Sequence, residues 1–384
     1  MNTVYLDNGA TSFPKAPGVG AAMAHYIDCV GANINRGTYR LASSAAIDVL
    51  ETRTLLAELF HFSGGEEHVL FTPGATAGLN QILRGFLHPG DHVVVSSMEH
   101  NAVMRPLVEL ADAGITFSRI PADQNGITRA SDLPPLLQPN TRLVLVSHAS
   151  NVCGSLFPLE ETAELCRLRK IPLAVDAAQT AGHIPLDFER LHLSALCVPG
   201  HKGLLGPQGI GALLLRPSFA AEVVPLITGG TGSASDQERQ PVYMPDRFES
   251  GTLNLPGIFG LRAALQYVSG HRPETLHQRE MELTARLLAG LDGIAALRIV
   301  GTTDLSQRVG VVSLDFLGQD NADAAFRLET EFGILTRCGL HCAPNAHKTL
   351  GTFPRGTVRL SIGYATTEAE IDQAAAAVRA VAKA

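Results

Sequence analysis

The chain lacks the features that mark secreted, membrane or nucleic-acid-binding proteins. Its N-terminus opens directly on Val4-Tyr5-Leu6-Asp7-Asn8, without the charged and apolar regions of a secretory signal peptide. No apolar run is long enough to span a bilayer. No basic stripe with interleaved aromatic residues is present, and the formal net charge is -7. We therefore expect a protein that binds neither membranes nor nucleic acid.

The cysteines are too few and too scattered for a disulfide framework. The chain has six cysteines, which are Cys29, Cys153, Cys166, Cys197, Cys338 and Cys342. This pattern favours reduced thiols and a cytoplasmic location. Cys338 and Cys342 lie close together, but no second pair of metal ligands lies near them in the sequence. No metal site is predicted from them.

Length and composition fit two lobes that share a cleft. The 384 residues exceed one typical domain. A hydrophobic content of 45% is enough for a large core, and 37 glycines suit an α/β protein with many tight turns. The sequence contains no internal repeat and no low-complexity segment.

Strand and helix patterns alternate through the first part of the chain. Strands are predicted over residues 68–72, 92–96, 116–120, 142–147, 172–176, 194–198 and 212–215, and helices over 45–62, 75–87, 101–113 and 160–169. Ser43 or Ser44 is the candidate cap of the first helix. Continuous apolar strands between helices indicate an α/β fold with a mainly parallel sheet covered on both faces. Ligands of such sheets bind at the carboxyl ends of the strands.

The pattern changes after a segment rich in Gly, Ser, Thr and Pro, residues 217–255. Helices are then predicted over 257–269, 274–291 and 322–332 and from Thr367 onward, with strands near 297–300, 310–316 and 357–362. These elements predict a smaller α+β lobe. We divide the chain into an N-terminal arm (1–15), a large domain (16–255) and a small C-terminal domain (256–384).

Lys202 is the most informative residue. It follows an apolar strand and stands in the run Gly200-His201-Lys202-Gly203, which is a poor place for a solvated charge. A buried amine there suits a Schiff base. The preceding strand ends in Asp176, and such an acid keeps the ring nitrogen of pyridoxal phosphate protonated, so that the ring can accept electrons. The alternative is an ordinary surface lysine at a strand end.

Weaker signals stand at the same edge of the predicted sheet. Gly74-Ala75-Thr76 joins a strand to a helix, where free N–H groups and the Thr76 hydroxyl would cradle a phosphate. The alternative is a plain helix cap. His100 follows a strand and could stack on a flat ring, although a histidine there is more often structural. Asn151 would bond a ring oxygen or the substrate, unless it only forms a turn.

Taken together, these motifs resemble the cysteine desulfurase and selenocysteine lyase family, which has the class V aminotransferase fold. The matching segments run in order over almost the whole chain and are Tyr5-Leu6-Asp7-Asn8-Gly9-Ala10-Thr11, Asn35-Arg36-Gly37, Gly74-Ala75-Thr76, Glu99-His100-Asn101, Ser150-Asn151-Val152-Cys153-Gly154, Val175-Asp176-Ala177-Ala178-Gln179, Gly200-His201-Lys202, Phe248-Glu249-Ser250-Gly251-Thr252 and Arg337-Cys338-Gly339-Leu340-His341-Cys342. The resemblance implies a pyridoxal phosphate-dependent transferase fold of the aspartate aminotransferase type. Its large domain would hold a mainly parallel seven-stranded sheet.

The resemblance assigns ring-binding roles by position. Lys202 would hold pyridoxal 5'-phosphate as a Schiff base, and Asp176 would pair with the pyridine nitrogen. Gln179 would bond the ring oxygen, and His100 would stack on the ring. Asn151 is a candidate for both cofactor and substrate.

The phosphate is expected at the start of the helix near residue 75. Thr76 and His201 match phosphate ligands of the family, and Ala75 stands beside them without the hydroxyl that some members carry. Thr252 would reach the phosphate from the neighbouring subunit, which implies a homodimer with its sites at the interface. Pro199 departs from the pattern, because many members have a serine there and proline has neither hydroxyl nor N–H.

Arg359 matches the arginine that grips the substrate α-carboxylate. A guanidinium suits that task because it binds a carboxylate through two hydrogen bonds. The alternative is a surface arginine on a strand. Arg337 and Asn8 are further candidates for substrate contacts.

Cys342 matches the nucleophile of the family, which attacks the substrate sulfur and becomes a persulfide. It follows His341 in a short connection from Arg337, an exposed context in which a thiolate can react. The alternative is a buried apolar cysteine. We therefore expect a cysteine desulfurase that converts L-cysteine to L-alanine and passes sulfur from Cys342 to an acceptor such as a partner protein. A selenocysteine lyase, a cysteine or cystine C–S lyase and a catalytically silent sulfur-relay homologue are the alternatives.

Overall fold

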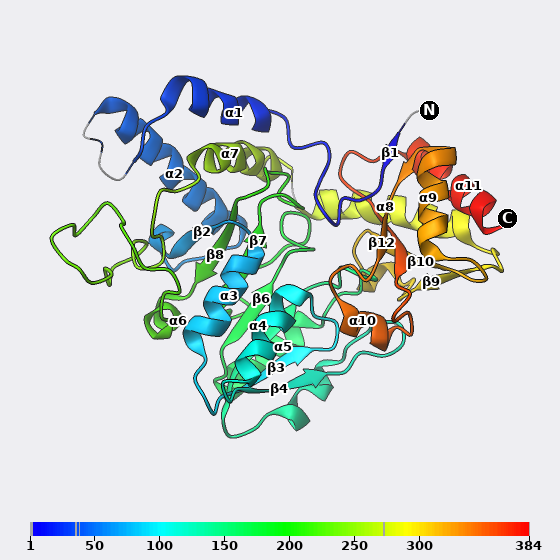
Figure 1. The fold of residues 1–384 in the computed structure, drawn as a ribbon, viewed down its shortest axis with the longest axis horizontal. Coiled ribbons are helices and arrows are strands. Elements are labelled where there is room, and N and C mark those ends of the chain that lie inside the picture. The colour runs from blue at the N-terminus through cyan, green and yellow to red at the C-terminus, as the bar shows by residue number, and fades with distance from the viewer. Residues whose placement is uncertain (1–2, 35–36, 38, 272, 384) are drawn as a thin grey trace.

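The protein is built around three β-sheets (Figure 1). Its computed structural model describes residues 3–34, 37, 39–271 and 273–383. A seven-stranded sheet has the order β2-β8-β7-β6-β5-β3-β4, a four-stranded sheet has the order β12-β13-β10-β9, and a two-stranded sheet joins β1 to β11. The predicted α/β fold with a smaller C-terminal sheet is confirmed.

The seven-stranded sheet is mainly parallel. Its strands are β2 (Val69–Thr72), β3 (His92–Ser96), β4 (Thr116–Ile120), β5 (Thr141–Ser147), β6 (Leu173–Asp176), β7 (Ala195–Pro199) and β8 (Gly211–Leu215). Strands β4, β3, β5, β6 and β7 pair in parallel, and β8 runs antiparallel to both of its neighbours. Because side chains alternate along a strand, Val94 packs in one core cluster while Val93 and Val95 pack in the cluster on the other face.

Helices cover both faces of this sheet. They are α1 (Val19–His25), α2 (Arg40–Leu59), α3 (Ala75–Phe86), α4 (Asn101–Ala111), α5 (Leu159–Arg169), α6 (Pro217–Glu222) and α7 (Leu255–Ser269). Helices α2, α5 and α7 share one core cluster, and α3 and α4 share the other. Short 3-10 or π segments lie at Tyr26–Val30, Glu66–His68, Ala130–Asp132, Pro134–Leu136 and Leu305–Gln307. Helix α7 belongs to this core although it begins at the predicted boundary of the small domain, and the domain division stays a prediction.

Helix α2 begins earlier than predicted. Its first residue is Arg40, and Tyr39 occupies the N-cap position without a side-chain hydrogen bond. The expected caps Ser43 and Ser44 lie inside the helix, so that prediction was wrong. The first turn of the helix carries the exposed Leu41, so it does not show the buried apolar spacing that predicts a helix. That spacing becomes regular only from the buried Ala45 onward.

The C-terminal sheet is antiparallel and packs against long helices. Its strands are β9 (Leu297–Val300), β10 (Val311–Phe316), β12 (Arg337–Gly339) and β13 (Thr357–Ser361), and the helices of this part are α8 (Pro273–Leu291), α9 (Asn321–Phe332), α10 (Pro344–Thr349) and α11 (Glu368–Ala382). Residues of α8, α9 and α11 form one core cluster with β10 and β13. Thr367 caps α11 in a reciprocal capping box with Glu370.

The N-terminal arm joins the two larger sheets. Strand β1 (Val4–Tyr5) pairs in parallel with β11 (Ile334–Leu335) beside the C-terminal sheet. The chain then crosses to the seven-stranded sheet, and in Figure 1 this dark blue segment runs from the N-terminus at the right to α1 at the left. None of the helices in the described part of the chain is both long and apolar enough to cross a membrane.

Phe316 tests how strongly the C-terminal part depends on its core. It ends β10 and is 0% exposed. We expect Phe316→Ala to cost about 3–5 kcal/mol, because apolar burial is lost and a cavity remains, and therefore to lower the midpoint of thermal unfolding by several degrees. The matched control is Phe326→Ala, since Phe326 of α9 is 66% exposed. Equal midpoints for the two variants would contradict this assignment of the core.

Candidate active site

A cavity of about 440 Å³ lies at the carboxyl ends of the parallel strands, beside the start of α3. Its lining includes residues that the sequence predicted for a single site: Ala75, Thr76, His100, Asn151, Asp176, Gln179, His201 and Lys202. They come from the ends of β5, β6 and β7 and from the starts of α3 and α4. The parallel sheet brings them together because its carboxyl ends meet at one edge.

Lys202 and Asp176 form the charged centre of the cavity. Burial lowers the pKa of Lys202 to about 8, and Asp176 opposes this shift. Burial raises the pKa of Asp176, while the Ala178 N–H and Lys202 act in the opposite direction. The Ala178 N–H donates to Asp176 Oδ1 at 3.0 Å and fixes one carboxylate oxygen. An amine with a pKa near 8 is easily deprotonated and can act as a nucleophile or base.

The turn that carries Lys202 is held by the N-terminal arm. The carbonyl oxygen of His201 accepts hydrogen bonds from the Ser12 N–H at 2.9 Å, from the Thr11 and Ser12 hydroxyls at 3.1 Å and from Lys15 Nζ at 3.0 Å. The Nδ1 atom of His201 is buried and has no hydrogen-bond partner among the described residues. It is an orphaned polar atom beside the cavity.

His100 is held in one tautomer. It is the N-cap of α4, and its Nδ1 accepts a hydrogen bond from the Ala102 N–H at 3.0 Å. Burial, with the charges of Lys202 and Arg105, lowers the pKa of His100 to about 4. The ring is therefore neutral near pH 7, with its proton on Nε2. A neutral imidazole on the cavity wall can stack on a flat ring and donate one hydrogen bond.

Gln179 and Asn151 connect the cavity to more distant segments. Gln179 Nε2 donates to the Gly9 carbonyl at 3.0 Å, and Asn151 Nδ2 donates to the His341 carbonyl at 2.6 Å. The sequence predicts Asn151 at the edge where the strands end. In the structure it lies in a turn, four residues beyond the end of β5. Each amide is oriented by a backbone carbonyl from another part of the chain.

Arg359 is buried, which excludes the alternative of a surface arginine. It is 2% exposed, donates from Nη1 to the Asn151 carbonyl at 3.1 Å and from Nη2 to Asp7 Oδ1 at 2.8 Å. Its Nε is buried without a hydrogen-bond partner among the described residues. Arg337 pairs with Arg359 across β12 and β13 and lies 4.0 Å from Asp7 Oδ2. Two guanidinium groups thus share one carboxylate at the boundary between the sheets.

Cys342 is exposed, which excludes the alternative of a buried apolar cysteine. His341 and Cys342 both have left-handed backbone conformations, with φ of 47° and 58°, and the Cys342 carbonyl accepts a hydrogen bond from the Asn101 N–H at 2.7 Å. The loop therefore lies directly beside His100. The segment from Arg337, expected as a plain connection, begins with strand β12 because Cys338 pairs with Val358.

Comparison with known proteins identifies the family. The class-V aminotransferase family matches residues 4–374. A probable cysteine desulfurase of Methanothermobacter thermautotrophicus is 32% identical over 373 residues, 96% of this chain and 92% of that protein. The structure of a cysteine desulfurase from Thermococcus onnurineus matches with a TM-score of 0.91 and 31% identity, over 99% of this chain and 95% of the other. A cysteine desulfurase structure from Escherichia coli matches with a TM-score of 0.88 and 26% identity, over 99% and 95%. The chain belongs to the class-V aminotransferase family.

Besides Arg359 and Cys342, three predicted residues do not line the main cavity. Thr252 is exposed and lines a separate cavity with Phe248 and Asn254. Asn8 lines a smaller cavity behind Lys202, and both ends of its amide bond to backbone groups, the Ser361 carbonyl and the Phe13 N–H. Arg337 pairs with Arg359 across β12 and β13 and does not line the cavity. Of the matched segment Asn35-Arg36-Gly37, the first two residues lie outside the described part of the chain.

Two acids near the site were not assigned a role from the sequence. Asp7 holds Arg359, and only its place in the first matched motif pointed to it. Glu99 is 1% exposed and accepts hydrogen bonds from the Ser96 and Ser147 hydroxyls at 2.5 and 2.7 Å. Burial raises the pKa of Glu99 to about 7, partly offset by these hydrogen bonds. The signal in the sequence was an acid directly after an apolar strand.

Class-V aminotransferases are pyridoxal phosphate-dependent, and the cavity fits that cofactor. Helix α3 starts without a side-chain cap, and Gly74 beside it leaves open space where a side chain would stand. These free N–H groups suit a phosphate, as does the unpartnered His201 Nδ1. Pro199 lines the cavity and supplies no donor there. Asp176, Lys202 and His100 are the charged and aromatic groups that a pyridine aldehyde requires.

The lowered pKa of Lys202 predicts a distinctive reactivity in the cofactor-free protein. Only a neutral amine reacts with an aldehyde, so labelling of Lys202 by formaldehyde and cyanoborohydride should rise with a midpoint near pH 8. The neutral fraction then grows from about one tenth at pH 7 to about nine tenths at pH 9. Peptide mass mapping measures each lysine, with exposed Lys170 as the internal reference for the reagent. A midpoint for Lys202 above about pH 10, the ordinary range of lysine, would refute the shift.

Proposed function

We propose that this protein is a pyridoxal phosphate-dependent cysteine desulfurase. The overall change would be L-cysteine plus the Cys342 thiol giving L-alanine plus a persulfide on Cys342. The observation that carries the proposal is that Cys342 is exposed and that its carbonyl bonds the Asn101 N–H, next to His100 on the wall of the cavity that contains Lys202. The relatives named cysteine desulfurase, at about 30% identity over nearly the whole chain, support the same class of reaction. A cytoplasmic location stays a prediction.

Arg359 would bind the substrate carboxylate. Its Nη atoms are held by Asp7 and Asn151, while its buried Nε lacks a partner among the described residues. Burial lowers the pKa of Arg359, which reflects an incompletely solvated cation that an anionic ligand would stabilise. Asn151 is tied at the same time to Arg359 and to His341. Substrate binding would therefore be coupled to the position of the cysteine loop.

Lys202 would hold the cofactor and then transfer protons. Bound pyridoxal phosphate supplies an electron sink for the substrate carbons. The Nζ atom of Lys202 would take the substrate α-proton and return a proton to the β-carbon, a task for which a pKa near 8 is suited. His100, neutral and with its Nε2 proton fixed by the Ala102 hydrogen bond, would cover the ring and donate to the reacting sulfur or oxygen.

Cys342 would carry the step that separates a desulfurase from a simple lyase. Its thiolate attacks the substrate sulfur, an S–S bond forms and the substrate Cβ–S bond breaks, with the electron pair leaving on Cβ, which Lys202 protonates. Arg359 lies close enough to Cys342 to interact with its charge. A selenocysteine lyase or a C–S lyase would use the same cavity residues, and the need for Cys342 distinguishes them.

Cys342→Ala tests the proposal. We expect alanine formation from L-cysteine to fall by at least about 100-fold, because no nucleophile takes the sulfur, while cofactor binding and the absorbance change on adding cysteine persist. The matched control is Cys29→Ala, which removes another exposed cysteine and should retain the parent rate. Alanine production near the parent rate in Cys342→Ala would overturn the proposal. Production of pyruvate and sulfide instead of alanine by the parent would favour a C–S lyase.

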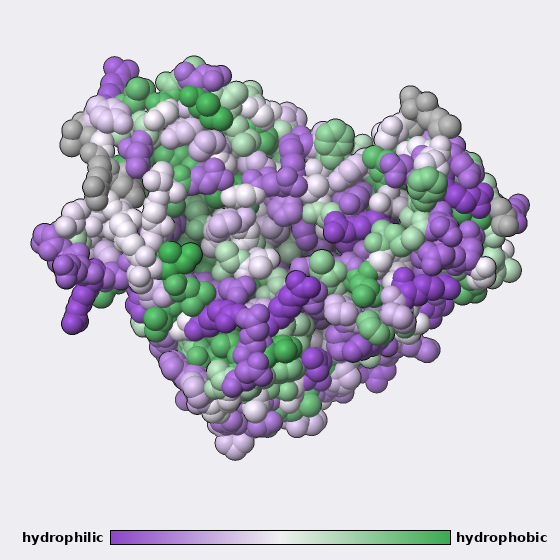
Figure 2. Space-filling view, in the orientation of Figure 1, coloured by the Kyte–Doolittle hydropathy of each residue, from purple (hydrophilic) through white to green (hydrophobic). Residues whose placement is uncertain are grey.

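We also propose that the active unit is a homodimer. Exposed apolar side chains gather on α2 and on the segment after α6: Ile47 is 66% exposed, Ile227 70% and Val242 82%. On the left side of the molecule, where these elements lie, Figure 2 shows some apolar residues (green) scattered among polar ones (purple). Thr252 lies in the same region and does not line the active-site cavity of its own chain. Pairing through this surface would remove the apolar groups from water and bring Thr252 toward a second chain.

Charges on this surface should separate the subunits. We expect the parent to sediment as a dimer and Ile47→Asp or Val242→Asp to dissociate at least about tenfold more readily, because an unpaired charge would be buried at the contact. Phe326→Asp is the control, since Phe326 is equally exposed on α9 at 66%. Sedimentation velocity over a range of concentrations gives the result. A parent that sediments as a monomer and keeps full activity would contradict the dimer.

A further inference from the structure

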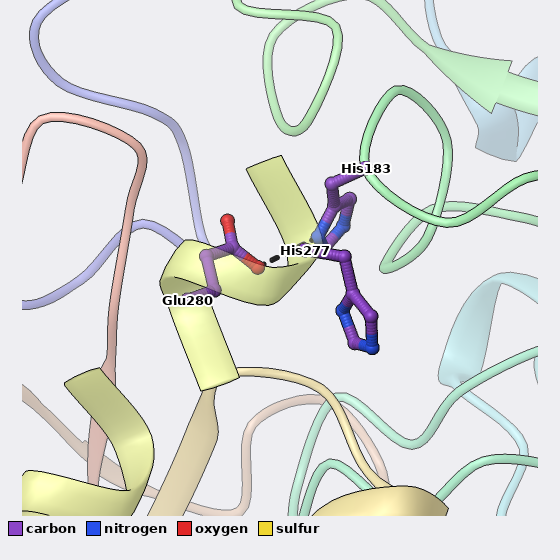
Figure 3. Close-up of side chains that lie close together, drawn as sticks. All are labelled: His183, His277 and Glu280. Carbon is purple, nitrogen blue, oxygen red and sulfur yellow. Dashed lines mark hydrogen bonds and ion pairs between the residues drawn. The ribbon is translucent and has the colours of Figure 1, made fainter. Parts of the chain in front are cut away.

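Two histidines and a glutamate converge outside the active-site cavity. His183 lies in the turn after β6, and His277 and Glu280 lie one turn apart on α8 (Figure 3). One ligand atom from each residue lies within 4.8 Å of the other two. Ligand atoms of one zinc ion lie at most about 4 Å apart, because each is about 2.0–2.1 Å from the ion, so small side-chain rotations would bring all three atoms into range.

His183 is already arranged as a ligand. Its Nδ1 lies 2.8 Å from Glu280 Oε2, and its Nε2 lies 2.9 Å from the Gln179 carbonyl oxygen. Both neighbours are acceptors, so in the absence of metal the ring must carry both protons or Glu280 must be protonated. A metal ion in place of the Nδ1 proton would satisfy both groups. The Nε2–H would still donate to Gln179, as metal-bound histidines commonly do to backbone carbonyls.

His277 supplies the second, independent observation. Its Nδ1 is buried and has no hydrogen-bond partner within the described residues. The residue lies three positions before Glu280, on the same face of α8. The side chains of His183 and Glu280 are only 13% and 10% exposed. A partly desolvated cluster with an unpaired imidazole nitrogen is incomplete without a ligand.

We propose that His183, His277 and Glu280 bind a divalent first-row transition metal, with zinc as the simplest case. Two imidazoles and one carboxylate are a common zinc ligand set that leaves a position for water. Magnesium and calcium prefer sites made of oxygen ligands. The proposal concerns a second site and is independent of the chemistry at Lys202.

The position of this site indicates what the metal would do. His183 belongs to the turn that also carries Gln179. Both residues, together with Glu280 and Lys202, line a small cavity of about 40 Å³. Helix α8 packs in the core of the C-terminal sheet. The ion would therefore tie the wall of the active-site cavity to the C-terminal part. Sequence spacing does not predict the cluster, because His183 and Glu280 are 97 positions apart.

Metal titration of the full-length, cofactor-loaded protein tests the site. Exposed thiols, among them Cys29 and Cys342, are first blocked with N-ethylmaleimide, and zinc binding is measured by calorimetry after treatment with a chelator. We expect about one zinc ion per chain in the parent and at least about tenfold weaker binding in His277→Ala, since loss of even a supporting contact costs that much. Cobalt should give visible d–d absorption in the parent that His277→Ala loses.

Two further variants make the result decisive. His271→Ala removes an exposed histidine at the end of α7 and should bind zinc like the parent. Glu280→Gln keeps the shape of the side chain but removes its charge and should weaken zinc binding like His277→Ala. Melting curves with chelator present verify that each variant is folded. Saturable zinc binding that is unchanged in His277→Ala and Glu280→Gln, or no saturable binding by the thiol-blocked parent, would overturn the proposal. No turnover is measured, so the outcome does not depend on the desulfurase activity.

Discussion

The site depends on the hydrogen bonds of the N-terminal arm, a single segment that turns after Asp7 and connects two sheets. Gly9 donates from its N–H to Ser361 Oγ at 2.8 Å on the C-terminal side, and its carbonyl accepts from Gln179 on the other. A few residues later, Ser12 donates to the carbonyl of His201, beside Lys202. A side chain at Gly9 would stand 3.2 Å from Ser361 Cβ, so close contact on this side favours glycine. The arm sets the spacing between the lysine turn and Arg359.

Buried cations keep the imidazoles near the cavity neutral. Burial together with Lys202 and Arg359 lowers the pKa of His100 to about 4, and burial together with Arg359 lowers that of His341 to about 2. The imidazoles therefore stay neutral near pH 7. Lys202 and Arg359, with neutral rings and free helix N–H groups, suit a dianionic phosphate and an amino-acid carboxylate together. Asp176 and Asp7 balance the two cations locally without cancelling that preference.

Much of the fold could be predicted because the strands of the large sheet are buried on both faces. The bounds of β3 coincide with the predicted range, since its run of valines is flanked by polar residues. Those of β4 also coincide, although β4 is a partly exposed strand at the edge of the sheet. The site followed from the same pattern, because polar residues at the ends of parallel strands must meet. The parallel order of the strands is therefore enough to bring Asp176, His100 and Lys202 together.

The elements that were missed are short or depend on distant pairing. Strand β12 has three residues, too few for any periodicity, and exists because it pairs with β13. The contact of Asp7 with Arg359 spans 352 positions, and β1 pairs with β11 over a similar separation. Helix α10 has six residues and starts at Pro344. Such features are set by tertiary packing, which local residue patterns do not record.

The hydrogen bond from the Asn101 N–H to the Cys342 carbonyl limits how far the Cys342 Sγ atom can move. Because the backbone is anchored at this residue, the sulfur moves mainly by rotation about one side-chain bond and sweeps a small arc at the protein surface. It cannot travel outward on a long tether. In the proposed sulfur transfer, an acceptor would therefore have to bring its own reactive group to the rim, and the shape of the surface around residue 342, not the length of the loop, would limit which acceptors react.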